Sequence, residues 1–215
     1  VLAGRDLDKG GTWLGVTLKG RFALVTNYRE GGANETAARS RGILAGDFLR
    51  GSAAPKAYLT AVSRDDGKYS GYNLIAGDRE SIYYHSNRGG GIRQLKAGVY
   101  GLSNHLLDTP WPKVKRGKEP LFGLLEQDGQ LLIDGLFDIL ADHSRPEDSR
   151  LPDTGIGLEW ERLLSAAFIA SSGYGTRSST VVLVSHDGAV TFVEQSFGPA
   201  GIPGERVSHE FRLSA

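Results

Sequence analysis

The 215-residue sequence contains neither cysteine nor methionine. The lack of cysteine excludes disulfides, thiolate metal ligands and a cysteine nucleophile within these residues. Lysine and arginine together number 25, and so do aspartate and glutamate, which gives a formal net charge of zero. Because a polyanion is held by an excess of basic side chains, we do not expect nucleic acid as a partner.

Long apolar runs are also missing. No stretch of 18 apolar residues occurs, and the first residues carry charges where a signal peptide would be apolar. We therefore expect no membrane span and no visible secretory leader, and a cytoplasmic location is favoured. Hydrophobic residues make up 40% of the sequence, which is enough to fill one core, so a single domain over residues 1–215 is expected.

The first half of the sequence predicts strand pairs and two short helices. β-Branched and aromatic residues at 12–18 and 21–28 flank Lys19-Gly20, the pattern of a hairpin with a two-residue loop. Residues 40–50 have helical spacing and stop at a glycine, and a short helix follows Pro55. Further strands are predicted at 72–76 and 81–85, then a loop at 87–91 before a strand that leads into Tyr100.

The second half predicts helices and then a return to strands. A helix is expected to begin at Trp111, between two prolines, and to run past Leu125. Amphipathic patterns at 131–140 and 158–169 predict two more helices, and alternating patterns at 178–185, 189–197 and 205–213 predict strands. Strand pairs, then helices, then strand pairs indicate an α+β fold with mainly antiparallel sheet whose faces are covered by helices.

The familiar catalytic and phosphate-binding motifs do not match. In "GLSNH", His105 replaces the last glycine of a nucleophile elbow, so Ser103 is interpreted as a turn or cap hydroxyl. The five histidines lack the spacing of a metal motif, and no metal site is expected. Glycines 89–91 lack the helix and Lys-Ser/Thr of a phosphate loop, and the cations at 113–118 are interpreted as a solvated helix face.

Three polar residues lie where strands are predicted to begin or end. Asn27 closes the second strand of the first hairpin, Asn104 is expected at a strand end, and Arg177 opens a strand. Because strand ends can meet at one edge of a sheet, two amides and a guanidinium could there stabilise an oxyanion or hold a carboxylate. The alternative is that the amides cap turns and the arginine forms a salt bridge.

Long segments of the sequence resemble one protein family. The resemblance lies in "VLAGRDLDKGGTWLGVTLKGRFALVTNYRE", "SRGILAGDFLRG", "YNLIAGD", "YYHSNRGG", "GLSNHLLDTPWPKVKRGK", "LPDTG", "EWERLLSAAFI" and "YGTRSSTVVLV", which follow one another in order along nearly the whole chain. The family is that of transport and Golgi organisation protein 2, also called NRDE after an Asn-Arg-Asp-Glu tetrapeptide. Its members are similar to N-terminal nucleophile (Ntn) hydrolases, which implies an αββα sandwich of two antiparallel sheets between helix layers.

The resemblance implies an amide hydrolase as one function. In the related hydrolases an N-terminal cysteine attacks an amide bond, and by analogy Asn27, Asn104 and Arg177 correspond to supporting polar positions. The family's Met-Cys start and its tetrapeptide are expected upstream of Val1, so that residues 1–215 form a single NRDE-type domain without that N-terminal segment. Since Val1 offers neither thiol nor hydroxyl, the chain as printed is predicted to be catalytically inert.

Ligand binding is the other function that the resemblance implies, through links of the family with haem movement and acyl-CoA homeostasis. We expect a pocket for a small amphipathic ligand, haem or an acyl compound, with Trp13, Tyr28 and Trp111 as walls and Arg177 or the cations at 113–118 meeting its acidic groups. The alternative for each aromatic residue is core packing.

We therefore favour a binding or trafficking protein with haem as its ligand, held labilely because no histidine is placed as an axial ligand. One alternative is an amide hydrolase whose cysteine nucleophile lies upstream. The other is a structural or scaffolding role. Protein partners are not indicated by the sequence. A mitochondrial or Golgi-associated location is the alternative to the cytoplasm for a eukaryotic protein.

Overall fold

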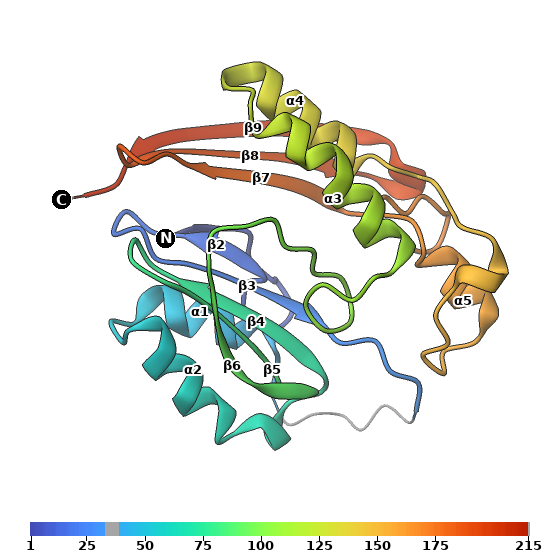
Figure 1. Ribbon diagram of the computed structural model, residues 1–215, viewed down its shortest axis with the longest axis horizontal. Coiled ribbons are helices and arrows are strands. Elements are labelled where there is room, and N and C mark those ends of the chain that lie inside the picture. The colour runs from blue at the N-terminus through green and yellow to red at the C-terminus, as the bar shows by residue number, and fades with distance from the viewer. Residues whose placement is uncertain (33–38, 215) are drawn as a thin grey trace. The chain divides into compact units, whose positions relative to one another are not determined.

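The computed structural model describes residues 1–32 and 39–214, which form two compact units (Figure 1). Unit 1 comprises residues 1–98 and 102–107 with the C-terminal residues from 213, and unit 2 comprises residues 99–101 and 108–212. Helices and two antiparallel sheets confirm the predicted α+β class. The single domain and the finer Ntn-hydrolase-like sandwich stay predictions.

Unit 1 is built on a six-stranded antiparallel sheet whose spatial order equals its order in the chain. Its strands are β1 (Leu2–Ala3), β2 (Leu14–Val16), β3 (Phe22–Asn27), β4 (Tyr72–Gly77), β5 (Ile82–Ser86) and β6 (Gly89–Leu95). Two helices, α1 (Gly42–Arg50) and α2 (Pro55–Ser63), lie along this sheet and are followed by the short 3-10 helix η1 (Asp66–Lys68) (Figure 1). The predicted helices and the strands at 72–76 and 81–85 are therefore confirmed.

The core of unit 1 lies between the two helices and the sheet. Phe48 of α1 and Leu59 of α2 are fully buried, as are Tyr72 and Leu74 of β4. Burial of each such side chain contributes about 1.5–3 kcal/mol relative to exposure. The Tyr58 hydroxyl, on the margin of this core, donates to a carbonyl of α1 at 2.6 Å, which ties α2 to α1.

The first hairpin is present, but its loop differs from the prediction. Backbone bonds from Thr17 N to Arg21 O (2.9 Å) and from Gly20 N to Thr17 O (3.0 Å) enclose three loop residues where two were expected. Gly20 has φ of 76°, the left-handed conformation that closes a three-residue loop and that glycine adopts without steric cost. The prediction of a hairpin at Lys19-Gly20 is therefore confirmed, but the predicted loop length of two residues was wrong.

The glycine-rich segment after β5 was predicted to be a loop, and this was wrong. Gly89 pairs with Ser86, so the chain turns at Asn87 and Arg88 and the glycines already belong to β6. The strand ends at Leu95, well before Tyr100. Asn104 consequently lies in a loop and not at a strand end, because the chain between β6 and the next helix pairs with no strand in the described residues.

Unit 2 consists of a three-stranded antiparallel sheet with a helical hairpin packed along it (Figure 1). Its elements are α3 (Pro112–Leu124), α4 (Gly129–Leu140), α5 (Leu158–Leu163), β7 (Ser178–Val184), β8 (Ala189–Phe197) and β9 (Pro203–Arg212), with 3-10 helices η2 (Asp148–Arg150) and η3 (Pro199–Gly201). Arg206 of β9 stacks 4.4 Å from the Phe137 ring of α4, and its guanidinium lies 3.5 Å from Asp134. These contacts hold α4 on the sheet.

The helix predicted over 158–169 is only half as long as expected. α5 ends at Leu163, and Phe168 then donates its backbone N–H to the Asp142 carbonyl at 2.9 Å. Phe168 is buried, with its ring 4.7 Å from that of Phe197. The apolar residues after Leu163 therefore belong to irregular backbone that enters the core, a case that helical spacing cannot distinguish from a longer helix.

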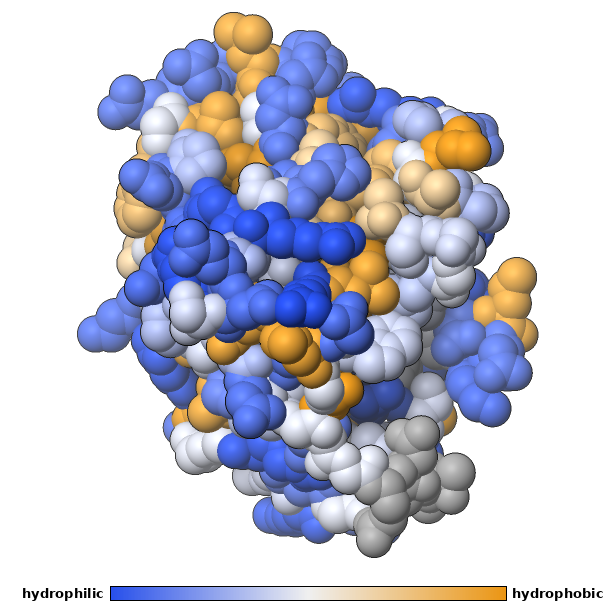
Figure 2. Space-filling model, turned by 90° about the vertical axis from the view of Figure 1, so that its right-hand side faces the viewer, coloured by the Kyte–Doolittle hydropathy of each residue, from blue (hydrophilic) through white to orange (hydrophobic). Residues whose placement is uncertain are grey.

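On the surface, hydrophilic residues predominate and hydrophobic residues lie among them in small groups, as one face shows (Figure 2). Such scattered apolar residues are normal for a folded protein. Within residues 1–32 and 39–214, no helix has the length and apolar character that crossing a membrane requires.

Candidate functional site

A loop formed by residues 102–107 is bonded along the end of β3 in unit 1. The Arg29 backbone N–H donates to the Asn104 carbonyl at 2.6 Å, and the Thr26 hydroxyl donates to the Ser103 carbonyl at 3.1 Å. The Asn104 side-chain amide donates to the Asn27 carbonyl at 3.2 Å. The fold thus brings Asn27 and Asn104 together although Asn104 is not on a strand.

A buried polar network lies beneath this loop. Asn73 of β4 is fully buried, and its amide donates to the Thr26 hydroxyl at 3.1 Å. Its side-chain carbonyl accepts from the Tyr84 hydroxyl at 2.8 Å, and that hydroxyl accepts from the Leu107 backbone N–H at 3.2 Å. Because Thr26, Asn73 and Tyr84 lie on neighbouring strands and the last bond reaches the Leu107 backbone, the network holds the loop against the sheet.

Tyr28 and His105 face one another at this end of the sheet. The Tyr28 hydroxyl lies 2.7 Å from His105 Nε2, and the two ring centroids are 4.7 Å apart. Burial lowers the pKa of His105 below its ordinary value, because removing water disfavours the charged imidazolium. The imidazole is therefore neutral at neutral pH. We call Asn27, Tyr28, Asn104 and His105 the strand-end cluster.

An ion pair flanks the strand-end cluster. The Arg88 guanidinium, in the turn between β5 and β6, donates to both carboxylate oxygens of Glu30 at 2.7 Å. This bidentate hydrogen bond holds the pKa of Glu30 below its ordinary value. The pair joins the segment after β3 to the β5–β6 turn, and so supports the backbone on which Tyr28 is carried.

A second polar group lies inside unit 1. His85 of β5 is buried, and its Nε2 lies 3.0 and 3.1 Å from the two Asp66 carboxylate oxygens. The Tyr72 hydroxyl donates to the same carboxylate at 2.5 Å, and burial together with this bond raises the pKa of Tyr72. His85 Nδ1 has no hydrogen-bond partner in the part of the chain that is described. We interpret the group as an anchor between η1 and the sheet.

The remaining predicted residues lie in different surroundings. Trp13, in unit 1, is 51% exposed, whereas Trp111, in unit 2, is buried at the start of α3. Arg177, also in unit 2, is exposed and directly precedes β7, and its carbonyl accepts from the Phe197 N–H at 2.8 Å. A meeting of Arg177 with the two asparagines stays a prediction, as does a ligand site walled by the aromatic residues.

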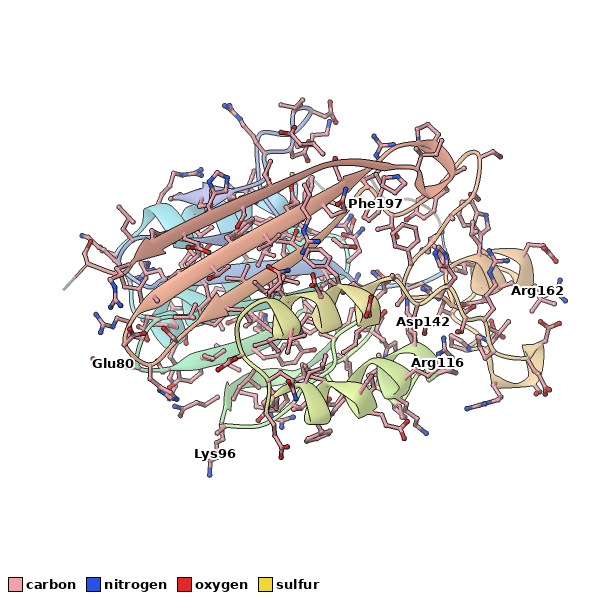
Figure 3. All side chains as sticks on the ribbon, turned by 90° about the horizontal axis from the view of Figure 1, so that it is seen from above. Glu80, Lys96, Arg116, Asp142, Arg162 and Phe197 are labelled. Carbon is pink, nitrogen blue, oxygen red and sulfur yellow. The ribbon has the colours of Figure 1, made fainter. Side chains whose placement is uncertain are left out.

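The cations at 113–118 were predicted to be solvated, and this is wrong for three of the four. Lys113 donates to the Leu164 carbonyl at 2.9 Å, and Lys118 to Asp108 at 2.6 Å. Arg116 pairs with Asp142 at 2.8 Å (Figure 3). Only the fourth, Lys115, is exposed. Charge patterning could not show this, because the partners lie up to 51 residues away in sequence.

Sequence reasoning overlooked His105 as a candidate. It was considered only as the residue that breaks the nucleophile-elbow motif, and Tyr28, whose hydroxyl it contacts, lies 77 residues earlier in the chain. The available signal was its place beside Asn104, which was itself selected. Among the described residues, no group of three or more His, Asp or Glu side chains is arranged to hold a metal ion.

The comparisons with known proteins agree with one another. The family model described as "Transport and Golgi organisation 2" matches residues 1–199. The chain is 39% identical over 234 residues to the Bos taurus "Transport and Golgi organization protein 2 homolog", covering 100% of this chain and 84% of that protein. The Homo sapiens homologue is 39% identical over 232 residues, with the same coverage, and the Mus musculus homologue is 37% identical over 212 residues, covering 91% and 76%. The chain belongs to the transport and Golgi organisation 2 family.

Proposed function

We propose that this protein binds and transfers haem or a similar amphipathic ligand, and that the strand-end cluster of unit 1 meets the ligand. The observation that carries this proposal is the contact between the Tyr28 hydroxyl and His105 Nε2 at 2.7 Å. A tyrosine oxygen and an imidazole nitrogen are both groups that proteins use to ligate haem iron.

The protonation state of His105 supports the proposal. Only a neutral imidazole has a nitrogen lone pair for a metal, and burial keeps His105 neutral by lowering its pKa. Because Tyr28 and His105 are hydrogen-bonded to each other, binding iron would require that they exchange this bond for the metal. The hydrogen bond between Tyr28 and His105 would therefore compete with iron binding and weaken the hold on haem. Weak binding suits a protein that passes haem on.

The neighbouring residues provide amphipathic surroundings. Leu106 packs so closely on Gly89 that a Cβ atom there would lie 2.5 Å from a Leu106 methyl group, and the Asn104 amide supplies a donor. Apolar side chains beside a few fixed polar groups are the usual composition of a small-molecule site. The word "transport" in the name of the family is consistent with a role in moving a ligand.

A haemin titration followed by the Soret absorbance tests the proposal. We expect His105→Ala to weaken haemin binding about tenfold or more, because the variant lacks one metal-binding side chain. Tyr28→Phe should also change the spectrum of the complex. His209→Ala, which removes an exposed histidine of β9, is the matched control and should bind like the wild type.

The result that contradicts the proposal is equal haemin affinity of the wild type, His105→Ala and Tyr28→Phe. Asn104→Leu offers an independent check, because it removes an amide that does not ligate metal. It should weaken binding while a native circular-dichroism spectrum shows that the fold is intact. Transfer is measured separately, as the rate at which the loaded protein gives haemin to apomyoglobin.

A further inference from the structure

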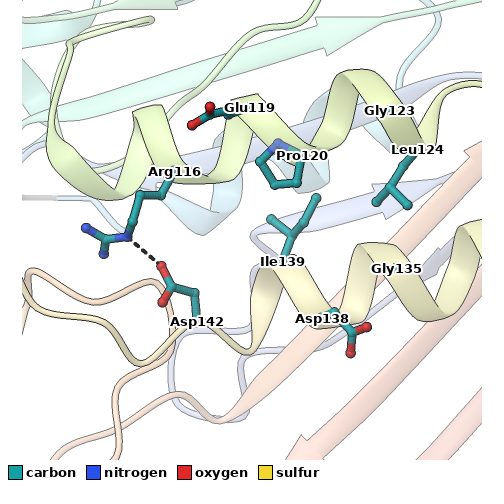
Figure 4. Close-up of a pocket in the computed structure, with 9 residues that line it drawn as sticks. All are labelled: Arg116, Glu119, Pro120, Gly123, Leu124, Gly135, Asp138, Ile139 and Asp142. Carbon is teal, nitrogen blue, oxygen red and sulfur yellow. Dashed lines mark hydrogen bonds and ion pairs between the residues drawn. The ribbon is translucent and has the colours of Figure 1, made fainter.

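Unit 2 contains a groove that the strand-end cluster does not use. It lies between α3 and α4 and has a volume of about 630 Å³ (Figure 4). This volume falls within the range of roughly 300–1,000 Å³ that is typical of binding sites. All of its lining residues belong to the helical hairpin or directly follow it.

The middle of the groove is apolar. Pro120 and Leu124 of α3 and Ile139 of α4 contribute its hydrophobic side chains, as Figure 4 shows. Two glycines leave room beside them. A Cβ atom at Gly135 would lie 2.4 Å from a Leu124 methyl group, so Leu124 fills that notch, whereas a Cβ atom at Gly123 would meet nothing within 4 Å. The space beside Gly123 is therefore open to a side chain from elsewhere.

The charged groups of the groove are mostly acidic. Arg116 is the single cation of the lining, and it already pairs with Asp142 at 2.8 Å and donates to the Ser144 carbonyl at 2.6 Å. Burial favours the neutral acid of Asp142, but the bonds from Ser144 and Arg116 outweigh it and lower the pKa, so Asp142 is ionised at neutral pH.

Two further carboxylates give the groove its net charge. Glu119 and Asp138 line it and form no ion pair with any residue that the structure describes. One guanidinium against three carboxylates gives a formal charge of −2. Such a charge repels carboxylates and phosphates and attracts a cationic partner.

We infer that this groove docks an amphipathic helix of a partner protein, with apolar anchors facing α3 and α4 and lysine or arginine beside them. An open groove between two helices accommodates a third helix through side chains at i, i+3, i+4 and i+7. The negative charge argues against an anionic membrane surface and against the acidic groups of haem. The same hairpin also exposes Phe122, Leu125 and Leu131, which do not line the groove, at 60–70%.

Fluorescence anisotropy with a labelled model peptide tests this inference. The peptide is an amphipathic helix of about five turns with leucine at i, i+3, i+4 and i+7 and lysine on its flanks. We expect saturable binding that Gly123→Trp weakens about tenfold or more, because the indole occupies the open space. Glu119→Gln combined with Asp138→Asn should weaken binding several-fold and reduce its dependence on salt.

Three controls make the result decisive. Glu147→Gln changes an exposed carboxylate of unit 2 outside the groove and should leave the affinity unchanged. A peptide with glutamate in place of lysine should bind at least tenfold more weakly. The melting temperature of Gly123→Trp shows whether the variant is folded, and the charge variants test the groove without filling it. Absence of binding by the lysine peptide, or equal binding to the wild type and to both groove variants, would overturn the inference.

Discussion

His105 Nε2 lies 2.7 Å from the Tyr28 hydroxyl, and burial lowers the pKa of this histidine from its ordinary 6.5. The unfolded chain therefore takes up a proton at His105 more readily than the folded protein does. The resulting stability is fully present above pH 6.5 and is lost as the pH falls through the lower, folded-state pKa.

We predict that the free energy of unfolding of the wild type falls more steeply between about pH 7 and pH 5 than that of His105→Gln, because glutamine does not titrate. Urea unfolding at several pH values measures both curves. In a direct check, the NMR titration midpoint of the His105 ring should lie below 6.5. Parallel stability curves for the two proteins would contradict the prediction.

Tyr84 should determine how firmly loop 102–107 is held. Its hydroxyl bonds to the buried Asn73 and accepts from the Leu107 N–H, so Tyr84→Phe leaves both groups without that partner. We expect a loss of about 1–3 kcal/mol in the free energy of unfolding and faster hydrogen exchange at Leu107. Tyr83→Phe is the matched control, since the neighbouring Tyr83 hydroxyl has no hydrogen bond within the described residues. Equal effects of the two variants would refute the role of the network.

The parts of the fold that the sequence predicted correctly are those fixed by local pattern. Alternating apolar residues gave the strands at 178–184 and 189–197, and a proline pair gave the start of α3. Such signals depend on neighbours a few residues apart. The helix expected through Ile169 failed because Phe168 is bonded to Asp142, a contact that no local window contains.

In the candidate site, too, the features set by local pattern were predicted and those set by long-range contacts were not. Asn27 was selected because a strand visibly ends there, and it does. Asn104 reaches the same place by another route, through a loop held by the buried Thr26–Asn73–Tyr84 network. Long-range hydrogen bonds of this kind leave no periodicity in the sequence, and for the same reason His105 was overlooked.

The ion pair between Glu30 and Arg88 predicts a dependence on acid pH. Arg88 holds the pKa of Glu30 below its ordinary 4.5, so the stabilisation is present above pH 4.5 and is lost as the pH falls through the lower, folded-state value. We expect Glu30→Gln to be less stable than the wild type at neutral pH by about 0.2–1 kcal/mol, the range for exposed pairs. The difference should shrink near pH 3 in urea titrations. A constant difference would exclude the ion pair as its cause.

The two glycines of the helical hairpin should respond differently to alanine. At Gly123 a methyl group meets open space, and replacing glycine within a helix stabilises by about 0.5–1 kcal/mol. At Gly135 the same methyl group would lie 2.4 Å from a Leu124 methyl group, so the end of that side chain must shift, which offsets the gain from replacing glycine. Thermal unfolding should place Gly123→Ala above the wild type and Gly135→Ala below Gly123→Ala. A higher melting temperature for Gly135→Ala than for Gly123→Ala would mean that Leu124 does not pack on Gly135. The lining of the groove between α3 and α4 would then differ from the one described.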